Sequence, residues 1–406
     1  MNFNQNYHYS YFIENIDYIE NIIKCQFKII MILMVRKIGF VSRYPPVHCG
    51  IAEYTKMLIS ALKSLNPKLE IYVFTTDEYK EESWYDDLGV NVIPCYSLLD
   101  TNYTRFLDML NEYPVDVLHL QHEYGIYGAH KEVIEALVKA REEGLTKKII
   151  VTMHTVDHSC TVRKERLKFQ AKLNEFDAII VHSFLQEFEL LMQGIEARKL
   201  YRIPHGTLIN PYLCYTKDYL ARSLGIRDEL KGMILSVPGF LRRDKGIDVL
   251  LEAMDMVDGK FTILIAGKSQ DPQVQELILS NNSVYVIDRY LSTDEILRIV
   301  ALADAIVLPY KDRSGAYAVS GILHLSMGGL KPIIGSRTPR LIELYQYAPQ
   351  MTVPAQEPKE LANKVNWLAN NYEYAVSYMS DLYAYAAKTQ WIRVGYLHLN
   401  LYQALL

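Results

Sequence analysis

"MILSVPGFLRRDKGIDVLLEAMDMVDGKFTILIAG", residues 233–267, decides the fold class of this chain. Two short apolar runs, MILSVP and FTILIAG, flank the stretch GIDVLLEAMDMV, which has the apolar spacing of an amphipathic helix. A strand, a helix and a second strand with near-continuous Val, Ile and Leu indicate a parallel sheet covered on both faces. The stretch therefore predicts a doubly wound α/β domain.

The same alternation runs along most of the chain in two series. The first series of expected strands is KIGFVS, EIYVFT, NVIPC, DVLHLQ, KIIVTM, AIIVHS and LYRIPHG, with helical stretches such as IAEYTKMLISALKSL between them. The rhythm breaks around residues 210–230, and MILSVP, FTILIAG, VYVID, AIVLPY, KPIIGS and QMTVPA form the second series. We therefore expect two successive doubly wound domains, and 406 residues exceed what one hydrophobic core usually supports.

Composition narrows the function class. Lys and Arg number 43 against 47 Asp and Glu, which gives a formal net charge of −4 and disfavours a nucleic-acid-binding protein. The five cysteines are scattered and form no CxxC pair, which indicates a reducing, cytoplasmic setting. The composition therefore indicates a globular enzyme or binding protein.

The first 33 residues differ from the rest. They are rich in Asn, Tyr and Ile, and Lys24 and Lys28 interrupt their apolar part, so they make a poor transmembrane span. They also lack a small-residue secretory cleavage site. We expect a poorly ordered N-terminal extension over residues 1–33, with a weak surface anchor as the alternative.

Four loops of the first series follow expected strands, where ligands bind in such sheets. Gly50 opens a helix after two prolines and lets the backbone approach a ligand closely. His122 and Glu123 end a strand before two glycines and are expected to line a site. His154 follows a strand, where it can hydrogen-bond or shuttle a proton. His205 ends the last strand, near the expected domain junction, where a cleft role competes with a simple turn.

His154 also begins a run that resembles metal ligation. Asp157, His158 and Cys160 follow it closely. A closed tetrahedral site usually carries paired CxxC or HxxxH elements, and this run has one element alone. We therefore disfavour a metal here.

The second series carries a cationic loop before a helix. Gly239, Arg242 and Arg243 precede Lys245, which with Gly246 opens the helix. Cations and glycines at a helix N-terminus suit a phosphate or diphosphate, because charge, free N–H groups and helix dipole act together. The G-x-x-x-x-G-K-[ST] spacing of a P-loop is absent.

Two further loops complete the second series. In VIDRYLSTDEI, Ser292 and Glu295 fit a capping box, which leaves Arg289 and Tyr290 to face a planar ring or a charge. In YAVSGILHLSMGGLKPIIGS, Ser320–Gly321 is a good helix start that favours an anion.

The motifs in their order resemble the GT-B glycosyltransferases of family 4. The resemblance rests on YPPVHCGIAEYT, LQHEYGIYG, VTMHT, IPHG, GFLRRDKGIDVLLEAM, DEILRIVALADAIVLPY and SGILHLSMGGLKPIIGS, and it is nearest to the subgroup with a PPxxCGIA loop. It covers the chain from about residue 36 to the end, where TQWIRVGYLHLNLY resembles the terminal helix that crosses back onto the first domain.

The resemblance implies the GT-B architecture, two Rossmann-like domains facing a central cleft. The domains would be 34–215, completed by a helix at about 388–406, and 225–387. It further implies a retaining transfer from a nucleotide-diphosphate sugar, held mainly by the second domain, to an acceptor held mainly by the first. No cofactor and no essential metal are expected.

Residue by residue, the resemblance assigns the following roles. Gly50 would lie near the donor phosphates and His154 near the transferred sugar, and Lys245 would contact the diphosphate. The remaining assignments are phosphate binding by Gly239, Arg242, Arg243, Ser320 and Gly321, base or ribose binding by Arg289 and Tyr290, and an acceptor or sugar cleft lined by His122, Glu123 and His205. His154 and Lys245 are the expected catalytic residues.

The chain departs from the family pattern in two places. Many members carry two glutamates eight positions apart, where this chain has Tyr317 and Leu325. An arginine usual in the first loop of the second domain is replaced by Phe240, and Arg242 or Arg243 would have to supply its charge.

Three hypotheses follow. The first is a glycosyltransferase using a donor of the GDP-mannose or UDP-glucose type and a glycan, lipid or small-molecule acceptor. The second is a non-catalytic nucleotide-sugar or glycan-binding protein of the same fold. A sugar-nucleotide epimerase is disfavoured, because SGAYAVSG offers no acid or base. Amphipathic helices of the first domain leave a peripheral membrane contact open.

Overall fold

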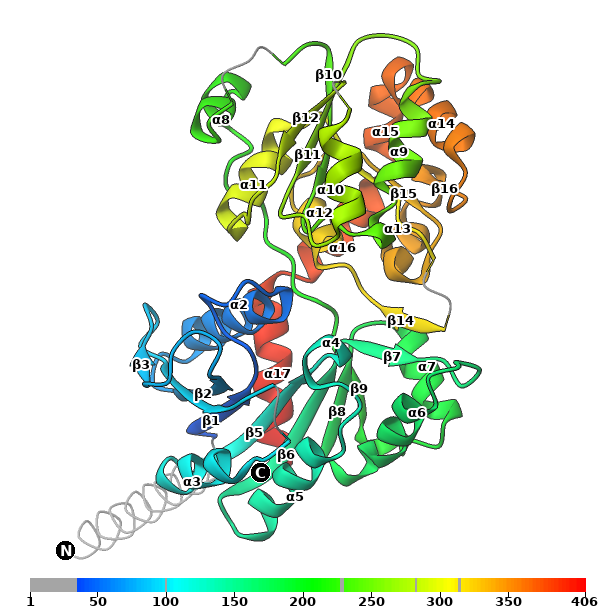
Figure 1. Ribbon diagram of the computed structural model, residues 1–406. Coiled ribbons are helices and arrows are strands. Elements are labelled where there is room, and N and C mark those ends of the chain that lie inside the picture. Colours follow the sequence, from blue (N-terminus) through cyan, green and yellow to red (C-terminus); the bar gives the residue numbers. More distant parts are fainter. Residues whose placement is uncertain (1–34, 99–100, 227–229, 282, 313–314) are drawn as a thin grey trace, which may run out of the picture.

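The computed structural model describes residues 35–406 except 99–100, 227–229, 282 and 313–314. The expectation for residues 1–33 lies outside the described residues. The chain forms two α/β units, one above the other in Figure 1. None of the helices within the described ranges has the length and apolar character to cross a membrane.

The first unit is built on an eight-stranded sheet of order β3-β4-β2-β1-β5-β6-β8-β9. Its strands pair in parallel except β3 with β4. The strands are β1 (Lys37–Val41), β2 (Glu70–Thr76), β3 (Trp84–Tyr85), β4 (Asn91–Tyr96), β5 (Val115–His122), β6 (Thr146–Met153), β8 (Ala178–Val181) and β9 (Leu200–Arg202). The helices are α2 (Gly50–Leu65), α3 (Thr104–Glu112), α4 (Tyr124–Tyr127), α5 (Glu132–Glu142), α6 (Lys164–Ala171) and α7 (Phe184–Met192).

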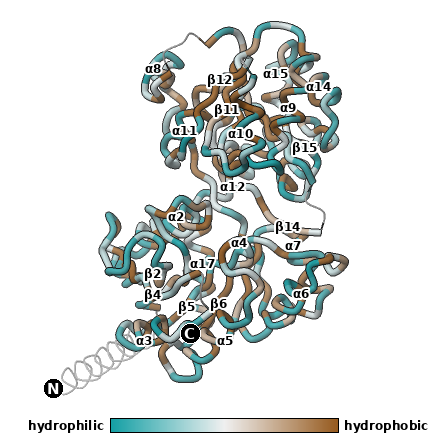
Figure 2. The backbone as a smooth tube through the Cα atoms, in the orientation of Figure 1, coloured by the Kyte–Doolittle hydropathy of each residue, from teal (hydrophilic) through white to brown (hydrophobic). Residues whose placement is uncertain are grey.

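The second unit is built on a six-stranded parallel sheet of order β12-β11-β10-β13-β15-β16. Figure 2 shows its central strands in the brown of hydrophobic residues. The strands are β10 (Met233–Pro238), β11 (Phe261–Ala266), β12 (Val284–Ile287), β13 (Ala305–Leu308), β15 (Ile333–Ser336) and β16 (Thr352–Val353). The helices are α8 (Lys217–Ser223), α9 (Ile247–Met254), α10 (Pro272–Leu279), α11 (Thr293–Leu302), α12 (Gly321–Met327), α13 (Ile342–Tyr347), α14 (Pro358–Asn370), α15 (Tyr372–Tyr378) and α16 (Ser380–Lys388).

The quoted stretch forms the expected unit. Residues 233–238 and 261–266 pair in parallel, from Met233 opposite Phe261 to Pro238 opposite Ala266, and α9 connects them. The expected capping box is present at α11, where Ser292 accepts from the backbone of Glu295. The strand expected at LYRIPHG ends early, at Arg202, shortly before Pro204.

The last helix, α17 (Trp391–Leu405), returns to the first unit. Its buried residues, among them Val394 and Tyr402, join the core that contains Ile38 and Leu58. A Cβ atom at Gly395 would lie 2.9 Å from the Cβ atom of Ala61, so this glycine lets α17 approach α2 closely. Helix α17 therefore packs on α2 of the first unit.

A two-stranded antiparallel ribbon that the sequence did not predict joins the two units. β7 (Thr155–Asp157) of the first unit pairs with β14 (Ala316–Ala318) of the second. It is visible between the units in Figure 1.

Candidate functional site

The candidate site lies where loops that follow strands of both sheets meet. Its second-unit part is centred on Tyr310, which is buried just after β13. The Lys245 ammonium lies 3.8 Å from the centre of the Tyr310 ring, and the Tyr310 hydroxyl lies 3.1 Å from Ser320 Oγ. Lys245 and Ser320, two residues expected to bind phosphate, are therefore brought together by a tyrosine that the sequence analysis did not select.

Glycines allow the loops around this centre to approach each other. Gly239 has φ of +99°, and a Cβ atom there would lie 2.7 Å from Ile322 Cδ1 of α12. A Cβ atom at Gly321 would lie 3.4 Å from His205 Nε2. Gly239 and Gly321 thus belong to one region, and His205 of the first unit faces the start of α12.

Helix α12 itself is short. It has seven residues, and the Ser320 hydroxyl already caps it by accepting from the Leu323 N–H at 3.3 Å. The first backbone N–H groups of a helix have no acceptor within the helix, so those of α12 can bind a ligand, whereas the Ser320 hydroxyl already serves as the cap.

The two arginines of the cationic loop point to different partners. Arg242 Nε donates to Asp244 Oδ1 at 3.0 Å, and Arg340 also pairs with the Asp244 carboxylate. Arg243 donates to Asp271 at 2.6 Å and its side chain is 62% exposed. The structure therefore brings Arg242 and Arg340 to the Lys245 loop, whereas Arg243 faces the start of α10.

Tyr290 is held by the first unit. Its ring lies parallel to the His48 ring with 3.6 Å between their centres, and its hydroxyl donates to Glu53 Oε1 at 2.8 Å. Thr293 Oγ1 donates to the other Glu53 oxygen at 3.0 Å. Burial and the Glu53 carboxylate raise the pKa of Tyr290, which stays protonated.

Gly50 and Arg289 belong to the two segments that make this contact. Gly50 opens α2, whose first turn carries Glu53, the acceptor of the Tyr290 hydroxyl. Arg289 pairs with Glu295 of α11 at 2.6 Å.

A cluster of histidines lies beneath the junction in the first unit. His154 is 7% exposed, with Nε2 3.0 Å from Gln121 Oε1 and Nδ1 3.4 Å from His182 Nε2. His182 in turn donates its Nδ1–H to the carbonyl of Ile203 at 2.9 Å. Each ring nitrogen of His154 therefore has a polar atom beside it, and a neutral His154 donates its single N–H to one of the two.

Tyr54 of α2 packs against three of these imidazoles. Its ring centre lies 4.7 Å from that of His154, 5.3 Å from that of His182 and 5.1 Å from that of His205. Burial lowers the pKa of all three histidines, to about 4 for His182, and the neighbouring imidazoles lower those of His154 and His205 further. The cluster is neutral at pH 7.

His122 and Glu123 do not lie together at the junction. His122 is fully buried, stacked 4.3 Å from Phe169, and burial lowers its pKa to about 3. It is a core residue and does not line a cleft, which corrects the expectation from the sequence. Glu123 caps α4 through the Gly125 N–H and accepts from Thr155 Oγ1 at 2.7 Å, at the base of β7.

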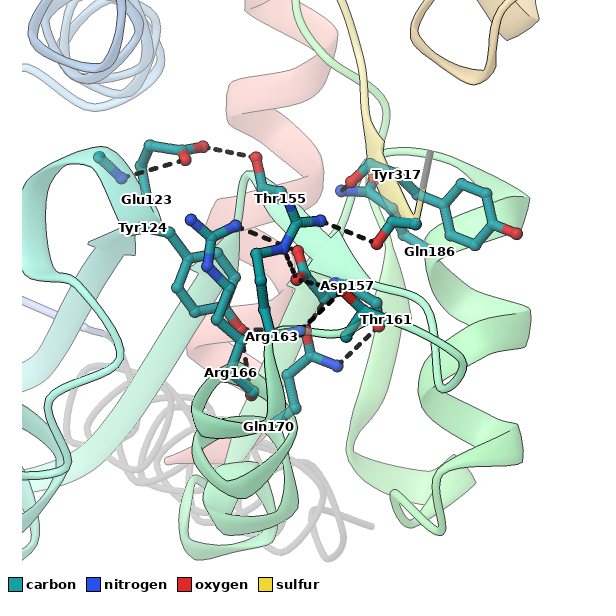
Figure 3. A network of polar contacts seen from close by, with 12 residues as sticks. Glu123, Tyr124, Thr155, Asp157, Thr161, Arg163, Arg166, Gln170, Gln186 and Tyr317 are labelled. Atoms are coloured by element: carbon teal, nitrogen blue, oxygen red, sulfur yellow. Dashed lines mark hydrogen bonds and ion pairs between the residues drawn. The ribbon is translucent and has the colours of Figure 1, made fainter. Parts of the chain in front are cut away.

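Figure 3 shows the polar network that anchors the ribbon. Asp157 is fully buried and accepts from Arg163 Nε at 2.5 Å and from Arg166 Nη1 at 3.2 Å. Arg163 also donates across the junction to the Gly315 carbonyl at 3.1 Å. The loop that precedes Ser320 is thereby held by the first unit.

The two positions where many family members carry glutamates lie in β14 and α12. Tyr317 lies within β14, and its carbonyl accepts from Gln186 of α7. Leu325 lies on α12 and is 9% exposed.

The run that resembles metal ligation is dispersed. His158 lies 3.5 Å from the Glu189 carboxylate, and Cys160 is exposed and free. Across the part of the chain that the structure describes, no group of three or more His, Cys, Asp or Glu side chains is arranged to hold a metal ion.

Sequence reasoning missed several residues of the junction. His182 directly follows β8, the same signal that selected His154, and could have been found. Tyr310, Arg340 and Glu53 carry no local signal, because their partners Lys245, Asp244 and Tyr290 lie 65 or more residues away along the chain.

Comparisons with known proteins find one similar family and several similar structures. Residues 232–371 match the family described as Glycosyl transferases group 1. A search of curated proteins finds no match. The solved structures that the chain resembles include the HepE protein of Anabaena in complex with UDP and glucose, at 15% identity and a TM-score of 0.68, with 91% of this chain and 100% of that chain covered.

Two other solved structures have the same arrangement. A glycosyltransferase of Rickettsia africae has 15% identity and a TM-score of 0.70, with 91% of this chain and 98% of that one covered. The catalytic domain of starch synthase IV from Arabidopsis thaliana, bound to ADP and acarbose, has 14% identity and a TM-score of 0.62, with 92% and 99% covered. The expected GT-B architecture is confirmed, and residues 232–371 are similar to the glycosyl transferases group 1 family.

Proposed function

We propose that this protein is a retaining glycosyltransferase that moves a sugar from a nucleotide-diphosphate sugar, of the GDP-mannose or UDP-glucose type, to a glycan, lipid or small-molecule acceptor. The premise is the glycosyl transferases group 1 domain of residues 232–371. The observation that carries the proposal is the convergence of Lys245, Tyr310, Ser320 and Gly239 within that domain. The neighbours solved with UDP or ADP support a nucleotide donor.

The chemistry asks for stabilisation of a departing diphosphate. When the bond between the anomeric carbon and the diphosphate oxygen breaks, negative charge grows on that oxygen. The Lys245 ammonium, 7% exposed, would act on it with little screening by water, and the amide groups at Ser320–Gly321 would add dipoles. These groups would supply the charge without a metal ion or other cofactor, and turnover in the presence of EDTA tests this.

The first unit would hold the sugar and the acceptor. His205 faces the start of α12 and is the histidine best placed to reach a group bound there. His154 would need to leave Gln121 or His182 to contact a sugar hydroxyl. We therefore assign His205 to the sugar side and give His154 a role that requires rearrangement.

The base side would involve Tyr290 and Arg289. Tyr290 offers one ring face to His48, so a bound base would use its other face or displace His48. A cytoplasmic setting and a peripheral membrane contact remain parts of the proposal.

Two observations favour a second candidate, a nucleotide-sugar-binding protein without turnover. His154 is enclosed by Gln121 and His182, and Tyr317 and Leu325 replace the usual glutamates. The two candidates differ in one product, the free nucleoside diphosphate.

The test incubates the protein with a panel of nucleotide sugars, with and without candidate acceptors, and measures binding and nucleoside diphosphate release. Release from one donor is expected, and Lys245→Ala should weaken donor binding at least tenfold, since a charge-assisted contact contributes about 1.5–3 kcal/mol. Lys364→Ala is the matched control, because Lys364 also lies over an aromatic ring, that of Trp367, away from the junction. Binding without release would favour the second candidate, and wild-type behaviour of Lys245→Ala would remove the phosphate assignment.

A further inference from the structure

Arg340 reaches the Lys245 loop from a distant part of the chain. It lies on a short 3₁₀ turn, Pro339–Leu341, which follows β15. Its guanidinium pairs with the carboxylate of Asp244, the residue before Lys245. The function proposed above gives this arginine no role.

The topology of the second sheet explains how these loops meet. Lys245 follows β10, Tyr310 follows β13 and Arg340 follows β15, and the three strands are neighbours in the order β10-β13-β15. Strand β11 pairs with the other side of β10, so the strand order reverses between β10 and β13. In open parallel sheets, ligands bind outside the carboxyl ends of the strands at such a reversal. Arg340 therefore belongs to the edge of the sheet where a ligand is expected.

The turn that carries Asp244 packs directly on the segment that carries Tyr310. Gly246, at the end of this turn, has φ of +68°, and a Cβ atom there would lie 1.8 Å from the Pro309 carbonyl oxygen. The Lys311 N–H donates to the Asp244 carbonyl at 3.0 Å. The backbone at Asp244 is therefore fixed relative to Tyr310.

Two guanidiniums share the Asp244 carboxylate. Arg242 donates to its two oxygens at 3.0 and 3.3 Å, and Arg340 binds the same group, which is 9% exposed. Within the described residues, two nearby carboxylates pair with cations of their own, Asp248 with Lys311 and Asp271 with Arg243. Together with Lys245, the group holds three cations and one carboxylate, which leaves two positive charges.

Both arginines keep hydrogen-bond donors for a ligand. A guanidinium has five N–H donors. The bonds to Asp244 use Nε and Nη2 of Arg242 and Nη1 of Arg340, whose side chains are 35% and 20% exposed. Asp244 thus orients the two planar groups without using all of their donors. Phosphate groups carry one negative charge each in a diester, so a diphosphate matches the two remaining charges and a monophosphate does not.

We propose that Arg340 binds the diphosphate of the donor and makes the site prefer diphosphates to monophosphates, with Asp244 as the residue that positions its guanidinium. The inference rests on the proposed function, which it deepens by a residue that determines specificity. Arg340 would act with Arg242 and Lys245 and would supply the charge that Phe240 lacks.

The test measures the binding of UDP, GDP and ADP, and of the corresponding monophosphates, by titration calorimetry. The wild type should bind one of the diphosphates about tenfold or more tighter than its monophosphate, and Arg340→Gln should remove most of this preference, because a charge-assisted contact contributes about tenfold or more. Arg340→Lys keeps the charge but loses the planar fork, and should retain part of the preference. The matched control is Arg298→Gln, because Arg298 is also a partly buried arginine of the second unit but pairs with Asp294 of α11, at 2.8 Å.

Thermal unfolding checks that the variants are folded. An unchanged preference for diphosphates in Arg340→Gln would overturn the inference. An equal loss of diphosphate and monophosphate binding would also overturn it, since damage to the base side has that effect. Unchanged diphosphate binding with weaker binding of the nucleotide sugar would move Arg340 to the sugar instead. A wild-type chain that binds none of these nucleotides would remove the proposed function itself, and this inference with it.

Discussion

The buried carboxylate of Asp157 offers the sharpest test of how the two units are joined. Asp157→Ala removes the acceptor of two arginines, Arg163 and Arg166, and leaves both charges without their buried partner. Breaking a fully buried ion pair costs about 3–5 kcal/mol. The Arg163 and Arg166 side chains are 38% and 29% exposed and can partly rehydrate, so we expect about 2–3 kcal/mol of destabilisation.

The assay combines thermal unfolding with hydrogen exchange. For a unit of this size, the expected loss corresponds to a decrease in Tm of roughly 5–10 °C. Arg163 would also release the Gly315 carbonyl, so the amides of residues 315–318 should exchange faster.

The control for this variant is Asp177→Ala. Asp177 is a partly buried carboxylate that also has two cationic partners, Arg141 and Lys148. The further hydrogen bond of Arg141 goes to the Glu175 carbonyl of the first unit, whereas that of Arg163 crosses the junction to Gly315. Asp177→Ala should lower Tm without changing exchange at residues 315–318. A Tm for Asp157→Ala within about 1 °C of the wild type, with unchanged exchange there, would refute the reasoning.

Three further predictions concern the junction and the buried histidines. Glu53→Ala removes two hydrogen-bond acceptors that join the units, each contributing about 1 kcal/mol, so amide hydrogen exchange at residues 290–293 should become faster. The control Glu135→Ala removes a surface ion pair with Lys131 and should leave that exchange unchanged. Gly206→Ala would place a Cβ atom 2.1 Å from the Trp391 ring and should cost about 1–3 kcal/mol in thermal unfolding, whereas Gly125→Ala has open space among the described residues; equal Tm values for the two variants would contradict this. Burial lowers the pKa values of His182 and His398 to about 4, so between pH 6.5 and 4 the unfolded chain binds protons that the folded chain does not. The free energy of unfolding should therefore decrease as the pH is lowered, by about 1.4 kcal/mol per pH unit for each histidine. His398→Leu should make that pH dependence shallower. Identical slopes for this variant and the wild type in urea unfolding at pH 7, 6 and 5 would count against the assignment.

The strands and helices of the two units could be predicted because each shows its own hydrophobic or capping pattern within a few residues. The strands of residues 233–238 and 261–266 are apolar runs, and α11 has its capping box within four residues. The ribbon of β7 and β14 could not be predicted, since each strand has three residues and its partner lies about 160 residues away. Local patterns do not contain such a pairing.

In the candidate site too, residues with a local sequence signal could be predicted and residues with distant partners could not. Gly239, Lys245 and Ser320 could be selected because they follow strands and open helices. His122 was misjudged, since the same position after a strand also suits a core residue, and the Phe169 ring that stacks on it is 47 residues away. Tyr310 and Glu53 act through distant partners and were missed for that reason.

The return of α17 to the first unit has a consequence for synthesis on the ribosome. Domains generally fold in the order in which they emerge. Here the first unit shares its core with Val394 and Tyr402, so it stays incomplete until residues 391–405 have been translated and have left the exit tunnel. A nascent chain carrying only the first unit would expose the α2 surface that α17 covers, and a premature stop codon before residue 391 would leave that surface open to chaperones and proteases.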